Sequence, residues 1–118
     1  MKLTINDIGG KIAKSNDTYV VKDNTVLNNL VVSSTLLYPG KETTGHSHEG
    51  QEEVYIFVKG TGKMLLRYPD EGQGETEDLF DVEPNDLVTI EDGAFHRVYN
   101  TGKEDLYFVC VFDGARKH

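Results

Sequence analysis

The sequence predicts an all-β domain made of two antiparallel sheets, and three observations support this fold class. Short segments rich in β-branched and aromatic residues recur along the chain. Turn-forming pairs such as Pro39-Gly40 and Asp92-Gly93 separate these segments. No stretch of about a dozen residues repeats apolar side chains at the helical spacing of i, i+3, i+4 and i+7. Many short strands at close spacing are typical of an antiparallel sandwich or barrel.

The expected strands follow one another along the chain. An N-terminal arm, residues 1–29, has weaker signals and is expected to supply an edge strand around residues 18–21. A central domain, residues 30–112, carries the remaining strand signals, at residues 30–38, 54–59, 63–68, 79–82, 87–90, 96–100 and 106–112. Within it, residues 69–78 read PDEGQGETED and are interpreted as a long, solvent-exposed hairpin loop. Residues 113–118 are expected to form a C-terminal tail.

Composition narrows the classes of function. The chain has 118 residues, of which 37% are hydrophobic, and a formal net charge of -8. This is enough for one globular domain with a real core. The acidic balance argues against a nucleic-acid partner, because binding to phosphate backbones requires clustered Lys and Arg.

Membrane partners are not expected either. The longest apolar run, residues 54–58, is far shorter than the roughly 20 residues of a spanning helix. Polar residues interrupt the first twenty positions, so a signal peptide is not indicated and a cytoplasmic protein is expected. The single cysteine, Cys110, lies in an apolar run and is expected to be buried rather than paired in a disulfide.

Three histidines and one glutamate form a pattern typical of a metal site. His46 and His48 are two residues apart, so in an extended segment both side chains point the same way, with α-carbons about 7 Å apart. Glu53 shares a strand face with Tyr55 and Phe57, and this face is either the interior or the solvent side. Its pairing with the two histidines favours the interior. A carboxylate buried among aromatic rings is costly unless a cation compensates its charge.

His96 offers a third imidazole far along the chain. Three neutral imidazoles and one carboxylate leave two positions of an octahedral ion open for water or substrate. We therefore expect one divalent metal ion, with His46, His48, Glu53 and His96 as its ligands. The alternative is an intact barrel in which the histidines are merely hydrogen-bonded core residues.

The spacing of these residues resembles the signature motifs of the cupin superfamily. The first motif sets a glycine, two histidines, a glutamate and a second glycine at fixed intervals, and this chain has all five: Gly40, His46, His48, Glu53 and Gly60. The second motif is matched in part, at Gly93, His96 and Asn100. Asn85 and Glu91 replace its first glycine and its proline, and the change at Asn85 is mild because Asn tolerates the left-handed conformation.

The resemblance to cupins implies a fold, a cofactor and a quaternary structure. It implies a double-stranded β-helix, the jelly-roll barrel of two antiparallel sheets, over residues 30–112. It also implies that the four candidate ligands hold Fe, Mn, Ni or Zn inside the barrel, and mixed nitrogen and oxygen ligands do not choose among these metals. Because cupins are commonly dimers, a homodimer is expected, and a small molecule is the expected ligand or substrate.

Four stretches are also similar to the archaeal cupin-type glucose-6-phosphate isomerases. They read TLLYPG at 35–40, TTGHSH at 43–48, EVY at 53–55 and KGTGKMLL at 59–66. This similarity implies that Thr35 and either Thr43 or Thr44 hold a phosphate.

The similarity also implies roles in proton transfer. Either Glu53 or a metal-bound water moves a proton between two carbons, while the metal stabilises the enediolate. Tyr55 lies on the same face as Glu53 and is expected to hydrogen-bond the substrate.

Two other functions remain open at this stage. A non-haem iron or nickel dioxygenase would use the same ligands and an apolar pocket. The residues that could line such a pocket are equally expected as core: Tyr55, Phe57, Met64, Leu66, Phe95 and Phe108. A metal-dependent protein that binds a sugar or small acid without turnover is the other alternative.

Overall fold

A computed structural model describes residues 1–47, 49–70 and 74–114. These residues form nine strands: β1 (Lys11–Ser15), β2 (Tyr19–Asn24), β3 (Leu30–Leu37), β4 (Glu53–Lys59), β5 (Gly62–Asp70), β6 (Gly74–Val82), β7 (Leu87–Ile90), β8 (Phe95–Tyr99) and β9 (Leu106–Asp113). No helix occurs in this described part of the chain, and hence none that could cross a membrane.

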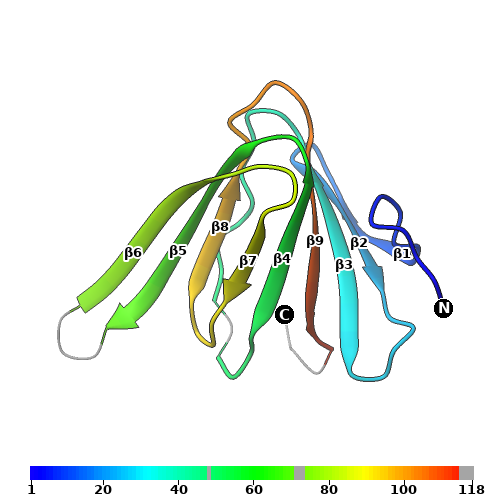
Figure 1. The fold of residues 1–118 in the computed structure, drawn as a ribbon, viewed down its shortest axis with the longest axis horizontal. Coiled ribbons are helices and arrows are strands. Elements are labelled where there is room, and N and C mark those ends of the chain that lie inside the picture. The colour runs from blue at the N-terminus through cyan, green and yellow to red at the C-terminus, as the bar shows by residue number, and fades with distance from the viewer. Residues whose placement is uncertain (48, 71–73, 115–118) are drawn as a thin grey trace.

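The strands are arranged in two antiparallel sheets, which confirms the predicted fold class. One sheet has six strands in the order β1-β2-β3-β9-β4-β7, and the other has three in the order β6-β5-β8. The sheets face each other and converge at one end, while at the other end they splay apart and do not close into a continuous barrel (Figure 1). Large apolar side chains fill the space between the sheets, and the most deeply buried include Leu37, Phe57, Met64, Leu106 and Phe108.

Strand β4 shows how the sequence pattern becomes an interior and an exterior face. Its residues alternate between buried and half-buried, and Glu53, Tyr55 and Phe57 are the buried ones. The face shared by these residues is therefore the interior, as the sequence analysis favoured. Cys110 on the adjacent strand β9 is buried with a free thiol, as expected.

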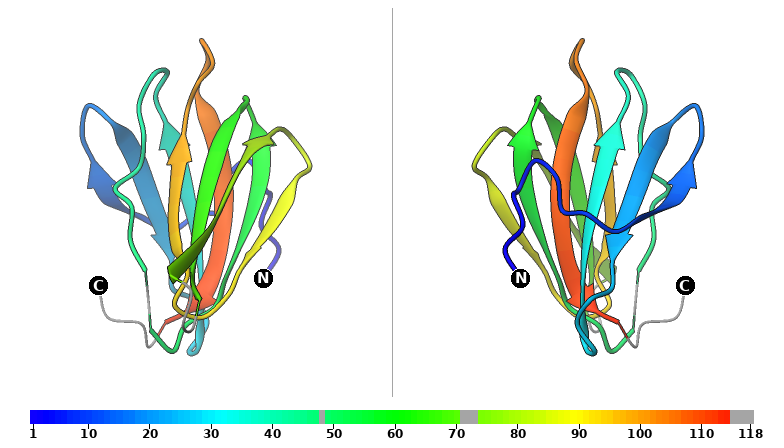
Figure 2. Two further views of the ribbon diagram at one scale, coloured as in Figure 1. Left: turned by 90° about the vertical axis from the view of Figure 1, so that its left-hand side faces the viewer. Right: turned by 90° about the vertical axis from the view of Figure 1, so that its right-hand side faces the viewer.

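The N-terminal arm contains two strands instead of one edge strand. Strands β1 and β2 form a hairpin, and β2 pairs with β3 along its whole length, so that β1 is the edge of the six-stranded sheet. Residues before β1 lie against the outer face of that sheet, where the hydroxyl of Tyr107 donates a hydrogen bond to the carbonyl of Ile5 at 2.9 Å (Figure 2). The hairpin thus extends the wall of the domain.

The prediction of a long loop at residues 69–78 is wrong for residues 69–70 and 74–78, and residues 71–73 lie outside the described part of the chain. Strand β5 continues to Asp70 and β6 starts at Gly74, and these two residues are paired. Residues 76–78 are exposed, and a two-stranded ribbon forms its cross-strand hydrogen bonds without an apolar face. An ion pair between Arg67 and Glu77, 3.9 Å from Nε to Oε2, links the two strands.

Candidate metal centre

Three chemically active side chains from distant parts of the sequence meet between the two sheets. Glu53 begins β4 in the larger sheet, and His96 is the second residue of β8 in the smaller one. His46 lies on the connection from β3 to β4, which runs antiparallel alongside β8. The backbone N–H of His46 donates to the carbonyl of His96 at 3.2 Å, and the reverse bond is 2.9 Å long. This reciprocal pair of bonds holds the two imidazoles side by side.

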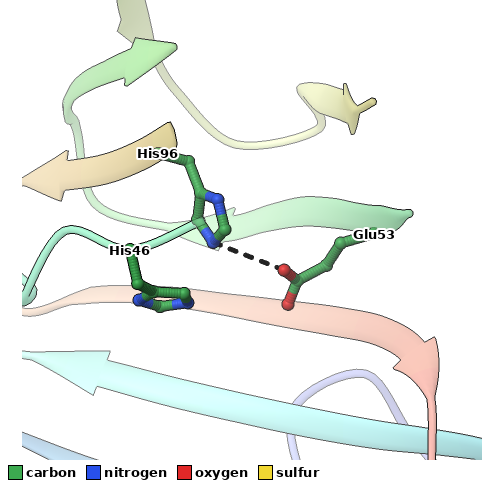
Figure 3. Close-up of side chains that lie close together, drawn as sticks. All are labelled: His46, Glu53 and His96. Carbon is green, nitrogen blue, oxygen red and sulfur yellow. Dashed lines mark ion pairs between the residues drawn. The ribbon is translucent and has the colours of Figure 1, made fainter. Parts of the chain in front are cut away.

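The geometry of the three side chains is that of a compact cluster (Figure 3). His96 Nε2 lies 3.4 Å from Glu53 Oε2, and the two imidazole rings are 4.3 Å apart at a 70° angle. One ligand atom from each of His46, Glu53 and His96 lies within 4.8 Å of the others. Two donors bound to one ion through bonds of about 2.0–2.2 Å lie at most about 4.4 Å apart, so the cluster is close to the size that a single ion requires.

Backbone carbonyls orient both imidazoles for metal binding. Nδ1 of His46 is 3.1 Å from the carbonyl of Thr44, and Nδ1 of His96 is 3.3 Å from the carbonyl of Ala94. A carbonyl can only accept, so each Nδ1 must carry the proton in these bonds. In a neutral ring this leaves the lone pair on Nε2, which is the arrangement that metal-binding histidines usually have.

The donor set suits a divalent cation. Glu53 and His96 have side chains only 5% and 2% exposed, whereas His46 is exposed. A buried carboxylate beside two imidazoles has its charge balanced when a cation lies between them. His48, the fourth predicted ligand, lies outside the described residues.

A cavity of about 420 Å³ adjoins the cluster. Its walls come from the inner faces of β1, β2, β3, β9 and β4 and from residues 43–46, and both His46 and Glu53 contribute to the lining. The three predicted phosphate-binding residues, Thr35, Thr43 and Thr44, also line it. The structure therefore brings the predicted substrate-binding residues and three of the predicted metal ligands to one space.

Tyr55 lines the cavity between these groups. Its ring stacks on Phe108 with centroids 5.1 Å apart and meets the His96 ring edge-on at 5.7 Å. Of the six residues named as pocket or core, all but the half-buried Phe95 belong to the hydrophobic core, and two of them, Tyr55 and Phe108, also line the cavity.

Thr43 also has a structural role in the wall of the cavity. Its hydroxyl oxygen accepts a hydrogen bond from the N–H of Val98 at 3.0 Å, and its own N–H donates to the Val98 carbonyl at 2.9 Å. These bonds fix the connection against β8 immediately before His46. Thr43 therefore helps to place the histidine as well as to line the cavity.

The sequence analysis missed the contribution of the N-terminal hairpin to the cavity. Lys14, Tyr19 and Asp23 line it, together with Ser33 on β3. The alternation of Tyr19, Val21 and Asp23 indicates a common face for these side chains. The sequence did not reveal which other surface that face meets, because the pairing of β2 with β3 depends on tertiary structure.

Comparison with known proteins identifies the family of this chain. A family model described as a cupin domain matches residues 34–112, and this segment carries all three clustered residues. The chain belongs to the cupin family.

Among curated relatives, the cupin resembles the glucose-6-phosphate isomerase of Pyrococcus horikoshii. The two are 34% identical over 110 residues, which cover 86% of this chain and 56% of the relative. The chain thus spans just over half the length of the curated isomerases that it matches.

Solved structures share the fold of this cupin. An oxalate decarboxylase from Bacillus subtilis, described with Mn(II) centres, matches with a TM-score of 0.75 at 20% identity, covering 86% of this chain and 27% of that one. KdgF from Halomonas sp. matches with a TM-score of 0.69 at 16% identity, covering 87% and 86%. At these identities the similarity concerns the fold alone.

Proposed function

We propose that this cupin is a metal-dependent isomerase that interconverts an aldose phosphate and a ketose phosphate. The observation that carries the proposal is the position of the His46, Glu53 and His96 cluster on a cavity that Thr35, Thr43 and Thr44 also line. The resemblance to curated glucose-6-phosphate isomerases, at 31–34% identity for several of them, supports the choice of reaction.

The metal ligands in this proposal are His46, His48, Glu53 and His96. The carbonyl-oriented imidazoles and the buried carboxylate support this set. A divalent ion supplies Lewis-acid stabilisation of the negative charge that develops on the two oxygens of an enediolate. Manganese is the first metal to test, since the related fold from Bacillus subtilis is described with Mn(II) centres.

Glu53 is one candidate for the base that moves the proton. Isomerisation transfers one hydrogen between adjacent carbons and one between their oxygens, so it requires no further reactant. If one oxygen of Glu53 stays off the metal, it can take the proton from C2 of the aldose and return it to C1. If both oxygens are engaged, a water molecule at the site acts as the base. Tyr55, on the same strand face, holds a substrate oxygen.

In this proposal, the threonines that line the cavity hold the phosphate. Thr35 on β3 and Thr43 or Thr44 on the connection line the cavity, and their hydroxyl groups suit phosphate oxygens. The rings of Tyr55 and Phe108 line the same cavity beside these threonines.

The test is an isomerase assay on protein purified without a His-tag and loaded with Mn²⁺. We expect glucose 6-phosphate to be converted to fructose 6-phosphate, and Glu53→Gln to lose the activity. Glu52→Gln, at an exposed neighbouring position, is the matched control and should retain it. Absence of turnover by protein holding one equivalent of metal would overturn the isomerase proposal. Oxygen uptake by iron-loaded protein would instead favour the dioxygenase alternative.

A further inference from the structure

We propose that Lys14, on the edge strand of the N-terminal hairpin, binds the phosphate of the substrate and gives the cavity its preference for phosphorylated sugars. The inference rests on the proposed function and deepens it by assigning a specificity residue outside the two cupin motifs. It starts from the charges that surround the cavity.

The cavity needs a cation besides the metal if it is to accept a phosphate dianion. The chain carries a net charge of -8, and the carboxylates of Asp23 and Glu53 both line the cavity. Lys14 is the single Lys or Arg among the described residues of the lining. Arg67 and Arg97 are engaged elsewhere, over the Phe95 ring and at the carbonyl of Thr43. Lys14 is thus the residue available to offset the repulsion of an anion.

A β-bulge turns Lys14 toward the cavity. In β1, Ile12 is opposite Lys22 and Lys14 is opposite Val21, so Ala13 is an extra residue without a partner of its own. Directly opposed residues of an antiparallel pair point to the same face, and Val21 lines the cavity. If Ala13 were paired with Val21 in a regular register, Lys14 would stand opposite Val20 and point away. Bulges are a recognised means of redirecting a side chain near a functional site.

The register of the sheet places Lys14 level with one of the proposed phosphate ligands. Val21, the partner of Lys14, is in turn the partner of Thr35 on β3. Two strand spacings of about 4.8 Å separate the backbones of Lys14 and Thr35, a gap that a lysine side chain and a phosphate group can bridge together.

Lys14 and the metal ligand Glu53 stand on opposite sides of the cavity. Three strands, β2, β3 and β9, lie between β1 and β4 in the sheet. A phosphosugar carries its carbonyl carbon and its phosphate at opposite ends. The cation and the metal cluster are therefore placed at different sides of the cavity, as the two ends of such a substrate require.

The test compares Lys14→Gln with Lys14→Arg and with Lys103→Gln as the control. Lys103 carries the same charge, but it is exposed on the turn between β8 and β9 and does not line the cavity. Loss of one charge-assisted contact should raise KM for the sugar phosphate by about tenfold or more in Lys14→Gln. The loss should fall on KM rather than kcat, Lys14→Arg should restore most of the affinity, and Lys103→Gln should behave like the wild type. An unchanged KM in Lys14→Gln, or an equal rise in Lys103→Gln, would overturn the assignment.

A binding measurement separates this inference from the isomerase proposal. Titration of the metal-loaded proteins with sorbitol 6-phosphate, followed by calorimetry, requires no turnover. Binding by the wild type that weakens in Lys14→Gln supports the role of Lys14 even if no isomerase activity is found. If the wild type shows turnover and both proteins bind sorbitol 6-phosphate equally well, the isomerase proposal is retained and the role of Lys14 is contradicted.

Discussion

Glu53 and His96 are two titratable side chains that lie in the interior of the domain. Both are almost fully buried, and the side chain of each faces the other at 3.4 Å. Tyr55 packs edge-on against the His96 ring, and the carbonyl of Ala94 faces its Nδ1. The ring is therefore held in one orientation by neighbours that do not themselves need a metal.

Replacement of Glu53 should weaken metal binding without removing the side-chain shape. Glu53→Gln keeps the volume and loses the negative charge, so we expect Mn²⁺ affinity to fall by at least about tenfold. His46→Ala should also lower occupancy. Metal content after dialysis, measured by elemental analysis, checks both variants against Glu52→Gln. A full equivalent of metal retained in His46→Ala would contradict the assignment of that ligand.

Asn100, the last matched residue of the second cupin motif, has a structural role. It is 2% exposed, and its Nδ2 donates to the carbonyls of Leu37 and Glu104 at 2.9 and 2.8 Å. Its Oδ1 accepts a hydrogen bond from the N–H of Gly102 at 3.0 Å. The side chain thus joins the end of β3 to the turn between β8 and β9.

Asn100→Ala should consequently destabilise the fold. One buried carbonyl, one part-buried carbonyl and one N–H lose their partner, which costs about 2–4 kcal/mol of the free energy of unfolding. Urea denaturation followed by circular dichroism measures the change. Asn29→Ala, at an exposed position, serves as the comparison and should cost much less. A loss below about 1 kcal/mol for Asn100→Ala would show that the three bonds contribute little.

At the scale of elements, residues in the left-handed conformation form turns between consecutive strands. Asn85 adopts a φ of 79°, in agreement with the expectation that it replaces the motif glycine in a left-handed conformation. Gly60 and Gly93, with φ of 82° and 79°, share that conformation but differ in their surroundings. A Cβ on Gly60 would overlap the carbonyl oxygen of Asp105, whereas nothing lies within 4 Å of a Cβ on Gly93.

The two glycines provide a matched pair for testing steric contact. Gly93→Ala should cost about 1–2 kcal/mol of the free energy of unfolding, because only the backbone conformation is unfavourable. Gly60→Ala should cost more, since the backbone between β8 and β9 must also move. Chemical denaturation of the two variants compares the effects. Equal losses would mean that the turn at Gly60 adjusts without strain.

At the scale of the whole molecule, the candidate metal centre draws its residues from both sheets. His46 and His96 belong to the smaller sheet and its neighbouring connection, while Glu53 belongs to the larger sheet. The two sheets splay apart at one end (Figure 1). An ion held by these three residues would link the sheets. The homodimer expected from the family stays a prediction, which light scattering can test.

Metal binding should accordingly stabilise the folded chain. At a free Mn²⁺ concentration of 100 times Kd, linkage adds about 2.7 kcal/mol to the free energy of unfolding. Thermal denaturation should show a higher Tm with Mn²⁺ than after chelation, and no such difference in His96→Ala. The His96→Ala protein must first be shown to fold by circular dichroism. A Tm that is independent of metal in the wild type would count against the site.

The sequence by itself determined the all-β class, the common face of Glu53, Tyr55 and Phe57 and the cupin motifs, because these depend on residue spacing within short segments. Side-chain alternation and turn conformations are local properties, so they can be deduced from neighbouring residues. Only the tertiary structure decided that the face of Glu53 is the interior, that His46 lies against His96, that β5 and β6 pair as far as Asp70 and Gly74, and that a bulge directs Lys14 into the cavity. These features depend on the register between strands, which contacts between distant residues establish.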